Sequence, residues 1–324
     1  MLVSQTPLIP NGVRIFLVFL LLGCTLASLG QFRHLHAYHA VDMIPGSLAT
    51  SRSSKTDEDP NKMITVTFFT MSLNDERYQE IKTALKSIIL NTAYKMTLFC
   101  MVCESRDEEM LREYLLNIDT QKQYHAKFIN ACHQETREYI LTTVKSWGTR
   151  NTHHNGYPGL AKFFIPLIMP QQVERTILLD TDIVVGEDIS LLWKGFDSFA
   201  SDTVIAFPPL NKRYFDRFCS CVGLLDLKRM RELGGWNHVD LSSGSIFGNE
   251  RVPATLPTGD QTLYTLAWLT KNELFQNLST SWNIMPYEVH AILSEKPFFG
   301  ILHYNVEVTG YWAAMKKYYE EVPL

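Results

Sequence analysis

The sequence carries no surplus of basic side chains. Its 324 residues include 30 lysines and arginines against 34 aspartates and glutamates, which gives a formal net charge of -4 at pH 7. Proteins that bind nucleic acid usually present a basic patch or stripe, so the composition gives no support to that class of function. A small anionic ligand would instead need a local cation, and a bound metal ion is one source of it.

Cysteine is scarce as well, with six in the whole chain. Cys24 lies in an apolar N-terminal run, which leaves an odd number elsewhere. Cys100 and Cys103 form a C-x-x-C pair in an apolar stretch without a second pair at zinc spacing, so we predict that both belong to the core. Cys219 and Cys221 are predicted to point to one face of a strand. Disulfides form readily in the secretory lumen, but the sequence does not assign a pairing.

The most apolar segment is residues 15–30, IFLVFLLLGCTLASLG. With its apolar neighbours it extends over residues 13–32, about the length that a bilayer requires. We predict a signal-anchor transmembrane helix of a type II membrane protein; a cleaved signal peptide is the alternative. Residues 1–12 would be a short tail, and the polar residues 33–62 a flexible stem. Either alternative delivers the rest of the chain to the lumen of the endoplasmic reticulum or Golgi.

Residues 63–324 are predicted to form one globular domain, because 46% of the chain is hydrophobic and ample core material is present. Short β-branched runs alternate there with segments of helical spacing. The first of these elements are predicted strands at 64–70, 96–103 and 124–129 and predicted helices at 77–91 and 107–117. The alternation predicts an α/β fold, with a mostly parallel central sheet and helices on both faces. Ligands bind such sheets beyond the carboxyl ends of the strands.

Two carboxylates, Asp180 and Asp182, lie between the apolar runs ILL and IVV in residues 176–185. We predict that this stretch is one strand buried on both faces. Residues two apart on a strand point the same way, so the aspartates would converge and Thr181 would turn away. Their charges would repel each other, and a hard cation such as Mg2+ or Mn2+ would relieve the repulsion. A solvated turn or a helix cap is the alternative interpretation.

Three further polar residues have a structural explanation as well as a functional one. Lys162 lies inside a predicted helix over residues 156–169, where a lysine usually extends its charge to the surface. Asp260 opens another predicted helix, where an aspartate is commonly the N-cap. His303 ends a short apolar run, and a lone histidine in such a position is usually a core or surface residue without a functional role. None of the three indicates a site by itself.

Several short segments nevertheless follow one another in a familiar order. They are 66–75 (VTFFTMSLND), 159–164 (GLAKFF), 176–185 (TILLDTDIVV), 220–231, 259–261 (GDQ), 281–283 (SWN) and 303–305 (HYN). Through them the sequence, from residue 64 onward, resembles glycosyltransferase family 8, which has the GT-A nucleotide-diphospho-sugar transferase fold. It looks most like animal secretory-pathway xylosyltransferases: the xyloside and glucoside xylosyltransferases and the xylosyltransferase domain of the dystroglycan-modifying enzymes.

The resemblance implies a metal site within a donor site. Asp180 and Asp182 would hold Mn2+, with Mg2+ possible, against the diphosphate of a UDP-sugar, and His303 would be the third protein ligand. Thr181 would lie with the two aspartates at the donor. Lys162 corresponds to a basic position that contacts the donor.

The resemblance also implies the remaining roles and the reaction. Thr70 and Asn74 would meet the uridine. Asp260 and Gln261 are the implied catalytic residues: Asp260 would hydrogen-bond the donor sugar, and Gln261 would lie beneath the anomeric carbon. The implied reaction transfers a sugar, xylose favoured and glucose next, to a glycan or glycoprotein acceptor with retention at the anomeric carbon. No general base is assigned.

Some positions depart from the family pattern. Cys219 and Cys221 replace an asparagine and a glycine, and Thr262 and Thr265 replace an aspartate and an asparagine. His303 is followed by Tyr-Asn-Val-Glu-Val, where the family carries glycine and lysine. The alternative function is therefore a catalytically weak or inactive protein that binds sugar nucleotides or glycans. A hydrolase or nuclease built on the aspartate pair is more remote, because no clear base accompanies the pair.

Overall fold

A computed structural model describes most of the chain beyond residue 62. The described ranges are 63–70, 73–118, 124–153, 156–210, 216–236, 241–242, 244–247, 250–285, 300–304 and 317–321. All of them belong to one compact unit. The predicted anchor at 13–32 and the predicted stem at 33–62 lie outside these ranges. Within them, no helix combines the length and the apolar character that crossing a membrane requires.

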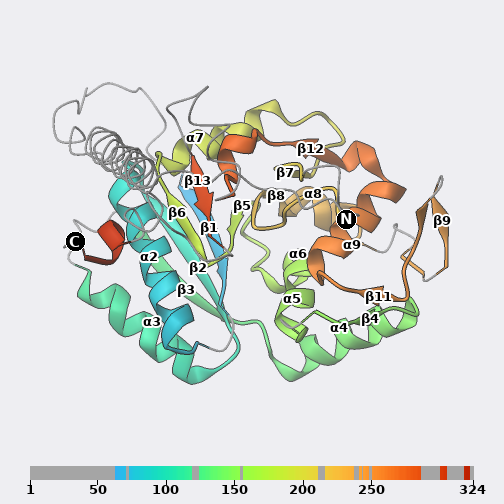
Figure 1. Cartoon of the computed structure of the whole chain (residues 1–324), viewed down its shortest axis with the longest axis horizontal. Helices are drawn as coiled ribbons and strands as arrows, with labels where there is room; N and C mark the ends of the chain where they lie inside the picture. The colour runs from blue at the N-terminus through green and yellow to red at the C-terminus, as the bar shows by residue number, and fades with distance from the viewer. Residues whose placement is uncertain are drawn as a thin grey trace, which may run out of the picture. The chain divides into compact units, whose positions relative to one another are not determined.

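A seven-stranded sheet forms the centre of this domain, in the order β12-β7-β8-β5-β1-β2-β3 (Figure 1). In that order the strands are β12 (Phe275–Asn277), β7 (Ile205–Phe207), β8 (Val222–Asp226), β5 (Arg175–Leu179), β1 (Ile64–Phe69), β2 (Met96–Val102) and β3 (Tyr124–Asn130). β8 is antiparallel to β5 and β7, and the other pairings are parallel. The prediction of a mostly parallel sheet is confirmed.

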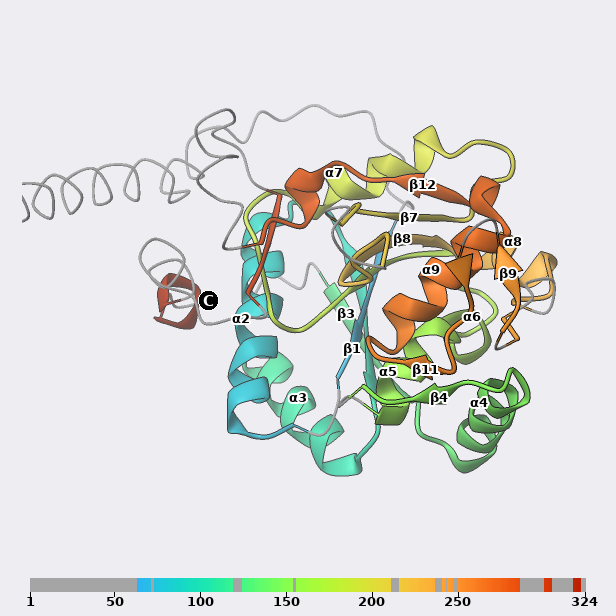
Figure 2. The same ribbon diagram turned by 45° about the vertical axis from the view of Figure 1, so that its right-hand side comes forward.

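Helices cover both faces of this sheet, as predicted (Figure 2). One face carries α2 (Asp75–Asn91) and α3 (Ser105–Asn117), and the other carries α4 (Gln134–Ser146), α5 (Gly156–Phe163), α6 (Ile165–Ile168) and α9 (Asp260–Thr270). The side chains of β5 alternate between the two cores. Ile177 and Leu179 pack on the α2 side, whereas Leu178 packs on the α5 side.

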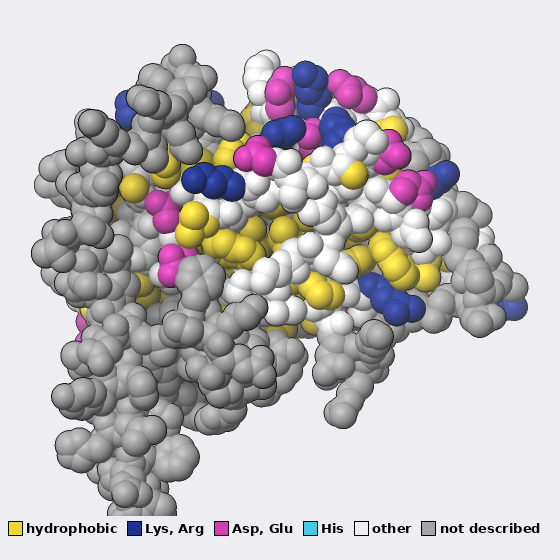
Figure 3. Space-filling view, turned by 90° about the horizontal axis from the view of Figure 1, so that it is seen from above, with side chains coloured by type: hydrophobic (Ala, Val, Ile, Leu, Met, Phe, Trp, Pro, Cys, Tyr) yellow, Lys and Arg dark blue, Asp and Glu magenta, His cyan; other side chains and the backbone are white. Residues whose placement is uncertain are grey.

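The other elements are short and connect or flank the sheet. They are β4 (Arg150–Asn151), β6 (Ile183–Val185), α7 (Ile189–Trp193), η2 (Lys194–Ser198), α8 (Leu227–Glu232), β9 (Ile246–Phe247), β10 (Glu250–Arg251), β11 (Thr255–Leu256), η3 (Asn272–Leu274), η4 (Thr280–Trp282) and β13 (Ile301–His303). Small two-stranded sheets join β9 to β10, β4 to β11 and β6 to β13. On the face in Figure 3, acidic and basic side chains are intermixed, as the near-balanced composition leads one to expect.

The prediction of a single strand over residues 176–185 is wrong. β5 ends at Leu179 within the large sheet, and β6 starts at Ile183 and pairs antiparallel with β13. Each pairing extends one residue toward the other: the N–H of Asp180 donates to the carbonyl of Cys221 at 2.8 Å, in register with β5–β8, and the carbonyl of Asp182 accepts from the N–H of Tyr304 at 2.9 Å, in register with β6–β13. The two aspartates are partly exposed at this break, which a strand buried on both faces would not allow.

The cysteine prediction is half right. Cys100 is buried and free, as expected of a core residue. Cys103 instead forms a disulfide with Cys132. The two lie just beyond the ends of β2 and β3, which are neighbouring parallel strands, so the fold brings them together. Cys219 and Cys221 precede β8 and are joined to each other.

Candidate active site

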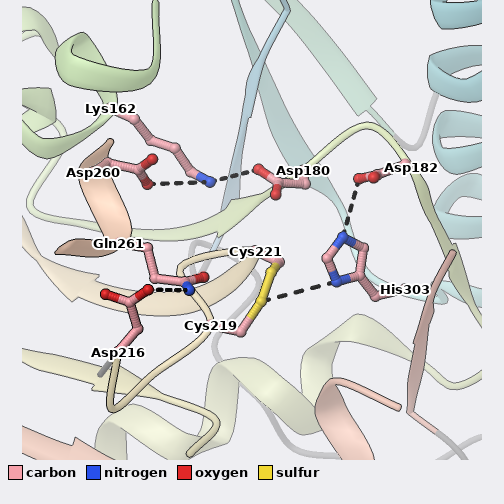
Figure 4. Close-up of a disulfide and its surroundings, with 9 residues drawn as sticks. All are labelled: Lys162, Asp180, Asp182, Asp216, Cys219, Cys221, Asp260, Gln261 and His303. Atoms are coloured by element: carbon pink, nitrogen blue, oxygen red, sulfur yellow. Dashed lines mark hydrogen bonds and ion pairs between the residues drawn. A yellow bond between two sulfur atoms is a disulfide. The ribbon is translucent and has the colours of Figure 1, made fainter. Parts of the chain in front are cut away.

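Polar side chains from separate parts of the chain meet at the break between β5 and β6 (Figure 4). Lys162 comes from α5, Asp180 and Asp182 from the break itself, Asp260 from the first position of α9 and His303 from the end of β13. The structure therefore gathers these predicted site residues at the carboxyl end of a central strand, the usual ligand position in open α/β sheets.

Lys162 is a buried cation between two carboxylates. Its Nζ lies 2.5 Å from Oδ1 of Asp180 and 3.6 Å from Oδ2 of Asp260. Burial disfavours the charged lysine, but the two carboxylates outweigh burial and raise the pKa of Lys162. Burial also raises the pKa of Asp260, against the opposing effect of Lys162. With only 6% of its surface exposed, Lys162 does not extend its charge to solvent, so the interpretation as a surface-seeking lysine is wrong.

His303 and Asp182 form the second ion pair of the site. Nε2 of His303 lies 3.3 Å from Oδ1 of Asp182. Burial opposes both charges. For His303 the nearby Asp182 outweighs burial and raises the histidine pKa, and for Asp182 the nearby His303 outweighs it and lowers the aspartate pKa. Each partner thus favours the charged form of the other.

Asp180, Asp182 and His303 also meet the geometric requirement for a metal site. One ligand atom from each residue lies within 4.8 Å of the others. Two carboxylate oxygens and one imidazole nitrogen suit a divalent ion such as Mn2+. Because both aspartates are partly exposed, an ion there would keep positions open for oxygen atoms of a ligand. The residues present therefore fit the metal that the sequence implies.

Gln261 follows Asp260 at the start of α9 and is held by Asp216. Its Nε2 donates to Oδ2 of Asp216 at 3.2 Å, and the same oxygen accepts from the hydroxyl of Thr258 at 2.8 Å. Gly259, with φ at 61°, occupies the N-cap position, so the interpretation of Asp260 as the cap is wrong. Asp260 is free to face Lys162 instead.

Two features of the site escape prediction from the sequence. Asp216 lies in a polar segment without apolar periodicity, and nothing in its neighbours marks it. The Cys219–Cys221 disulfide lies beside His303, with Sγ of Cys219 3.8 Å from Nδ1 of the imidazole. Its signal is the departure from the family pattern at both cysteines, which indicates a changed site without indicating the bond.

Three other residues are predicted to contact the donor: Thr70, Asn74 and Thr181. Thr70, just past β1, is fully buried and its hydroxyl donates to the carbonyl of Met101 at 2.7 Å. Asn74 is exposed and caps α2, accepting from the N–H of Arg77 at 2.9 Å. Thr181 lies between the two aspartates and is partly buried. The side-chain hydrogen bonds of Thr70 and Asn74 therefore serve the local fold.

The hydroxyls of the threonines that replace polar family residues in α9 form hydrogen bonds within the domain. The hydroxyls of Thr262 and Thr258 are 2.5 Å apart, and the hydroxyl of Thr265 accepts from the N–H of Arg217 at 3.0 Å. Both replacements are fully buried, so they act as part of the packing beneath the site. Glu307, the acidic departure after His303, lies outside the described residues.

Known proteins resemble this chain in both sequence and structure. Mouse xylosyl- and glucuronyltransferase LARGE2 is 27% identical over 205 residues, 57% of this chain and 25% of the relative. Chicken LARGE1 is 40% identical over 65 residues, 20% of this chain and 8% of the relative. The match to mouse LARGE2 thus spans about a quarter of that relative's length.

Two solved glycosyltransferase structures share the fold. Apo mouse xyloside xylosyltransferase 1 superposes with a TM-score of 0.57 at 18% identity, covering 75% of this chain and 97% of that one. The galactosyltransferase LgtC, in complex with donor and acceptor sugar analogs, superposes with a TM-score of 0.50 at 12% identity, covering 79% and 95%. The mixed α/β, GT-A-like fold is therefore confirmed. Residues 69–202 match the model of glycosyl transferase family 8, so this part of the chain is similar to that family.

Proposed function

We propose that this chain is a retaining, Mn2+-dependent glycosyltransferase that moves a sugar from a UDP-sugar to a glycan or glycoprotein acceptor. The observation that carries the proposal is the convergence of Asp180, Asp182 and His303 within 4.8 Å, next to the buried Lys162–Asp260 pair. A divalent ion and a fixed lysine give the positive charge that a diphosphate needs, in a protein whose net charge is -4.

Different residues of the chain would bind the metal and orient the donor. Asp180, Asp182 and His303 would hold the metal, which when bound supplies Lewis acidity toward the diphosphate. Lys162 lies between the carboxylates of Asp180 and Asp260 and would add a second positive charge. Asp260, facing the same space, offers a carboxylate that can accept hydrogen bonds from sugar hydroxyls.

Gln261 is the residue that we place beneath the anomeric carbon. Its amide nitrogen donates to Asp216, so the carbonyl oxygen Oε1 is turned away from that aspartate. This orientation would present a neutral oxygen to the positive charge that develops at the sugar carbon. A front-face transfer with retention requires no further nucleophile, and none is assigned.

Xylose is the favoured donor sugar, with glucose next. The support for xylose is the names of the relatives: a xylosyl- and glucuronyltransferase in sequence and a xyloside xylosyltransferase in structure. We further propose that residues 13–32 anchor the protein in the Golgi or endoplasmic reticulum membrane, with the domain in the lumen. The apolar length of that segment supports the anchor.

UDP release by the full-length chain tests the proposal. UDP-xylose, UDP-glucose, UDP-galactose, UDP-N-acetylglucosamine and UDP-glucuronate are supplied in turn with Mn2+. The Asp182→Asn variant removes a metal ligand, and Asp197→Asn, which changes an exposed aspartate on η2, is the matched control. We expect Mn2+-dependent release with one preferred donor, lost in Asp182→Asn and retained in Asp197→Asn.

The alternative function is a protein that binds a sugar nucleotide with little or no turnover. The Cys219–Cys221 disulfide favours it, because the bond replaces two family residues at the site and lies beside His303. Metal-dependent UDP binding without release, for every donor and acceptor supplied, would support this alternative. Absence of both metal and UDP binding would remove the site assignment itself.

A further inference from the structure

His303 faces two different sets of potential metal ligands. Its Nε2 lies 3.3 Å from Oδ1 of Asp182, and its Nδ1 lies 3.8 Å from Sγ of Cys219 (Figure 4). The two ring nitrogens point in different directions, so one imidazole can serve either set. The first set is the oxygen-rich site described above. The second consists of the two sulfur atoms of the Cys219–Cys221 disulfide.

The second set has the spacing of a metal site. The sulfur atoms of Cys219 and Cys221 and a ring nitrogen of His303 all lie within 4.8 Å of one another. All three residues are buried, with 2%, 5% and 3% of their surfaces exposed. The geometry is also anchored, because the carbonyl of Cys221 accepts a 2.8 Å hydrogen bond from the N–H of Asp180. The sulfur and carboxylate sets are therefore fixed next to each other.

We propose that Cys219, Cys221 and His303 form a second, redox-controlled metal site, which binds Zn2+ once the disulfide is reduced. Two thiolates and one imidazole are ligands that Zn2+ accepts, and the fourth position would be left to water. While the disulfide is intact, neither sulfur offers a thiolate, and this site does not exist. The two sites differ in softness: sulfur selects Zn2+, whereas the carboxylates select Mn2+ or Mg2+.

The redox step is an ordinary thiol–disulfide exchange. A dithiol donates two electrons and two protons, the S–S bond between Cys219 and Cys221 breaks, and the dithiol leaves as its own disulfide. Zn2+ then displaces the two thiol protons as the thiolates bind. Since His303 serves both sites, Zn2+ on Nδ1 would compete with the Asp180–Asp182 site for the same imidazole. That consequence rests on the proposed function, but the existence of the site does not.

Cobalt binding to the full-length chain tests the proposal without an activity assay. The protein is reduced with a water-soluble phosphine, which takes its oxygen from water as the disulfide gains two protons, and the phosphine is then removed. Co2+ is the probe, because sulfur-to-cobalt charge transfer produces an absorption band that oxygen ligands do not. We expect the band in the reduced protein, its absence in the oxidised protein and its loss when Zn2+ is added.

Paired variants identify the ligands. The double variant Cys219→Ser/Cys221→Ser should lose the band. The matched control is Cys103→Ser/Cys132→Ser, which removes the other disulfide and should keep the band. Asp180→Asn should also keep the band, because that residue contributes only to the oxygen-rich site. No band in the reduced wild-type protein, or a band that survives in Cys219→Ser/Cys221→Ser, would overturn the proposal.

A second measurement uses the wild-type protein and does not depend on the folding of a variant. The reduced protein is alkylated with and without Zn2+, and mass spectrometry reports each cysteine separately. We expect Zn2+ to protect Cys219 and Cys221 and to leave the alkylation of Cys103 and Cys132 unchanged. Cys100 is an internal reference, since burial raises the pKa of its thiol to about 12 and keeps it unreactive. Equal alkylation of Cys219 and Cys221 with and without Zn2+ would overturn the proposal.

Discussion

The ammonium group of Lys162 lies 2.5 Å from Oδ1 of Asp180, and the two side chains point toward each other (Figure 4). The lysine is buried, whereas the side chain of Asp180 is 30% exposed. A charge held in this way cannot turn to solvent when its partner is lost, so the pair couples the stability of the domain to the chemistry of the site.

Replacing Lys162 with methionine should therefore affect both stability and activity. The buried Asp260 would lose its cation, and we expect the free energy of unfolding to fall by about 3 kcal/mol. UDP release should fall on the order of a hundredfold. Lys145→Met, which changes an exposed lysine on α4, is the control, and its free energy of unfolding should stay within about 0.5 kcal/mol of the wild-type value. Equal effects in urea unfolding of the two variants would show that Lys162 is not a structural cation.

Asp216 should act as a positioning residue for Gln261. Asp216→Ala removes the acceptor of the Gln261 amide, and we expect kcat to fall about tenfold with little change in KM, because the substrate is still bound. Asp216→Asn keeps one carbonyl oxygen and should recover most of the loss. If the asparagine and alanine variants lose the same activity, the charge of Asp216 matters and the orientation of Gln261 does not.

Mn2+ affinity should depend on three side chains, two from the β5–β6 break and one from the end of β13. Asp180→Asn, Asp182→Asn and His303→Gln each remove one ligand, and each should weaken Mn2+ binding by at least about tenfold. The electron paramagnetic resonance signal of free aqueous Mn2+ measures the Mn2+ affinity directly, without any donor present. Asp197→Asn should bind Mn2+ as the wild-type protein does. Wild-type affinity in all three ligand variants would place the metal elsewhere.

Local patterns in the sequence account for much of the fold and for most of the candidate site. The strand and helix alternation from residue 64 follows apolar spacing, and the structure confirms β1, α2, β2, α3 and β3 in that order. Asp180 and Asp182 can be recognised in the sequence because charged residues are rare within apolar runs. Their shared location with Lys162, Asp260 and His303 came from the family resemblance, since no local rule joins residues so far apart.

The features that escaped prediction depend on contacts between distant segments. After β5 the chain passes to β6, which pairs with β13 in a separate small sheet, and β13 lies more than a hundred residues away in sequence. The Cys103–Cys132 bond follows from the adjacency of β2 and β3, which spacing alone does not fix. Asp216 became part of the site only through its hydrogen bond to Gln261. Sequence periodicity carries no information on any of these pairings.

The Cys103–Cys132 disulfide should stabilise the domain. It closes a loop with a sequence separation of 29 residues, for which loop-closure entropy predicts about 3–4 kcal/mol. Cys103→Ala/Cys132→Ala should lower the free energy of unfolding by that amount in a denaturant titration. Cys219→Ala/Cys221→Ala removes a disulfide whose cysteines are only two residues apart in sequence, and it should lower the free energy of unfolding much less. The reverse ranking would contradict the entropic explanation.

Gly223 in the middle of β8 should tolerate no side chain. A Cβ built there would overlap ring carbons of Phe207, and both residues are on buried neighbouring strands. The ring cannot move aside, because it also packs edge-to-face on Tyr264 with centroids 4.8 Å apart. We expect Gly223→Ala to lower the free energy of unfolding by about 1–3 kcal/mol through overpacking, as measured by urea denaturation.

Two comparisons separate this overlap from the general effect of alanine in place of glycine. At Gly195 the added Cβ would lie 2.6 Å from Cδ1 of Leu224, the far end of a flexible side chain, so Gly195→Ala should cost less than Gly223→Ala. Phe207→Leu in the Gly223→Ala background should recover part of the loss, since the leucine is smaller than the ring. If Gly223→Ala costs the same free energy of unfolding with and without Phe207→Leu, so that the two effects simply add, no contact joins residues 223 and 207. A coupling of about 1 kcal/mol or more would establish that the ring of Phe207 is what requires glycine on β8.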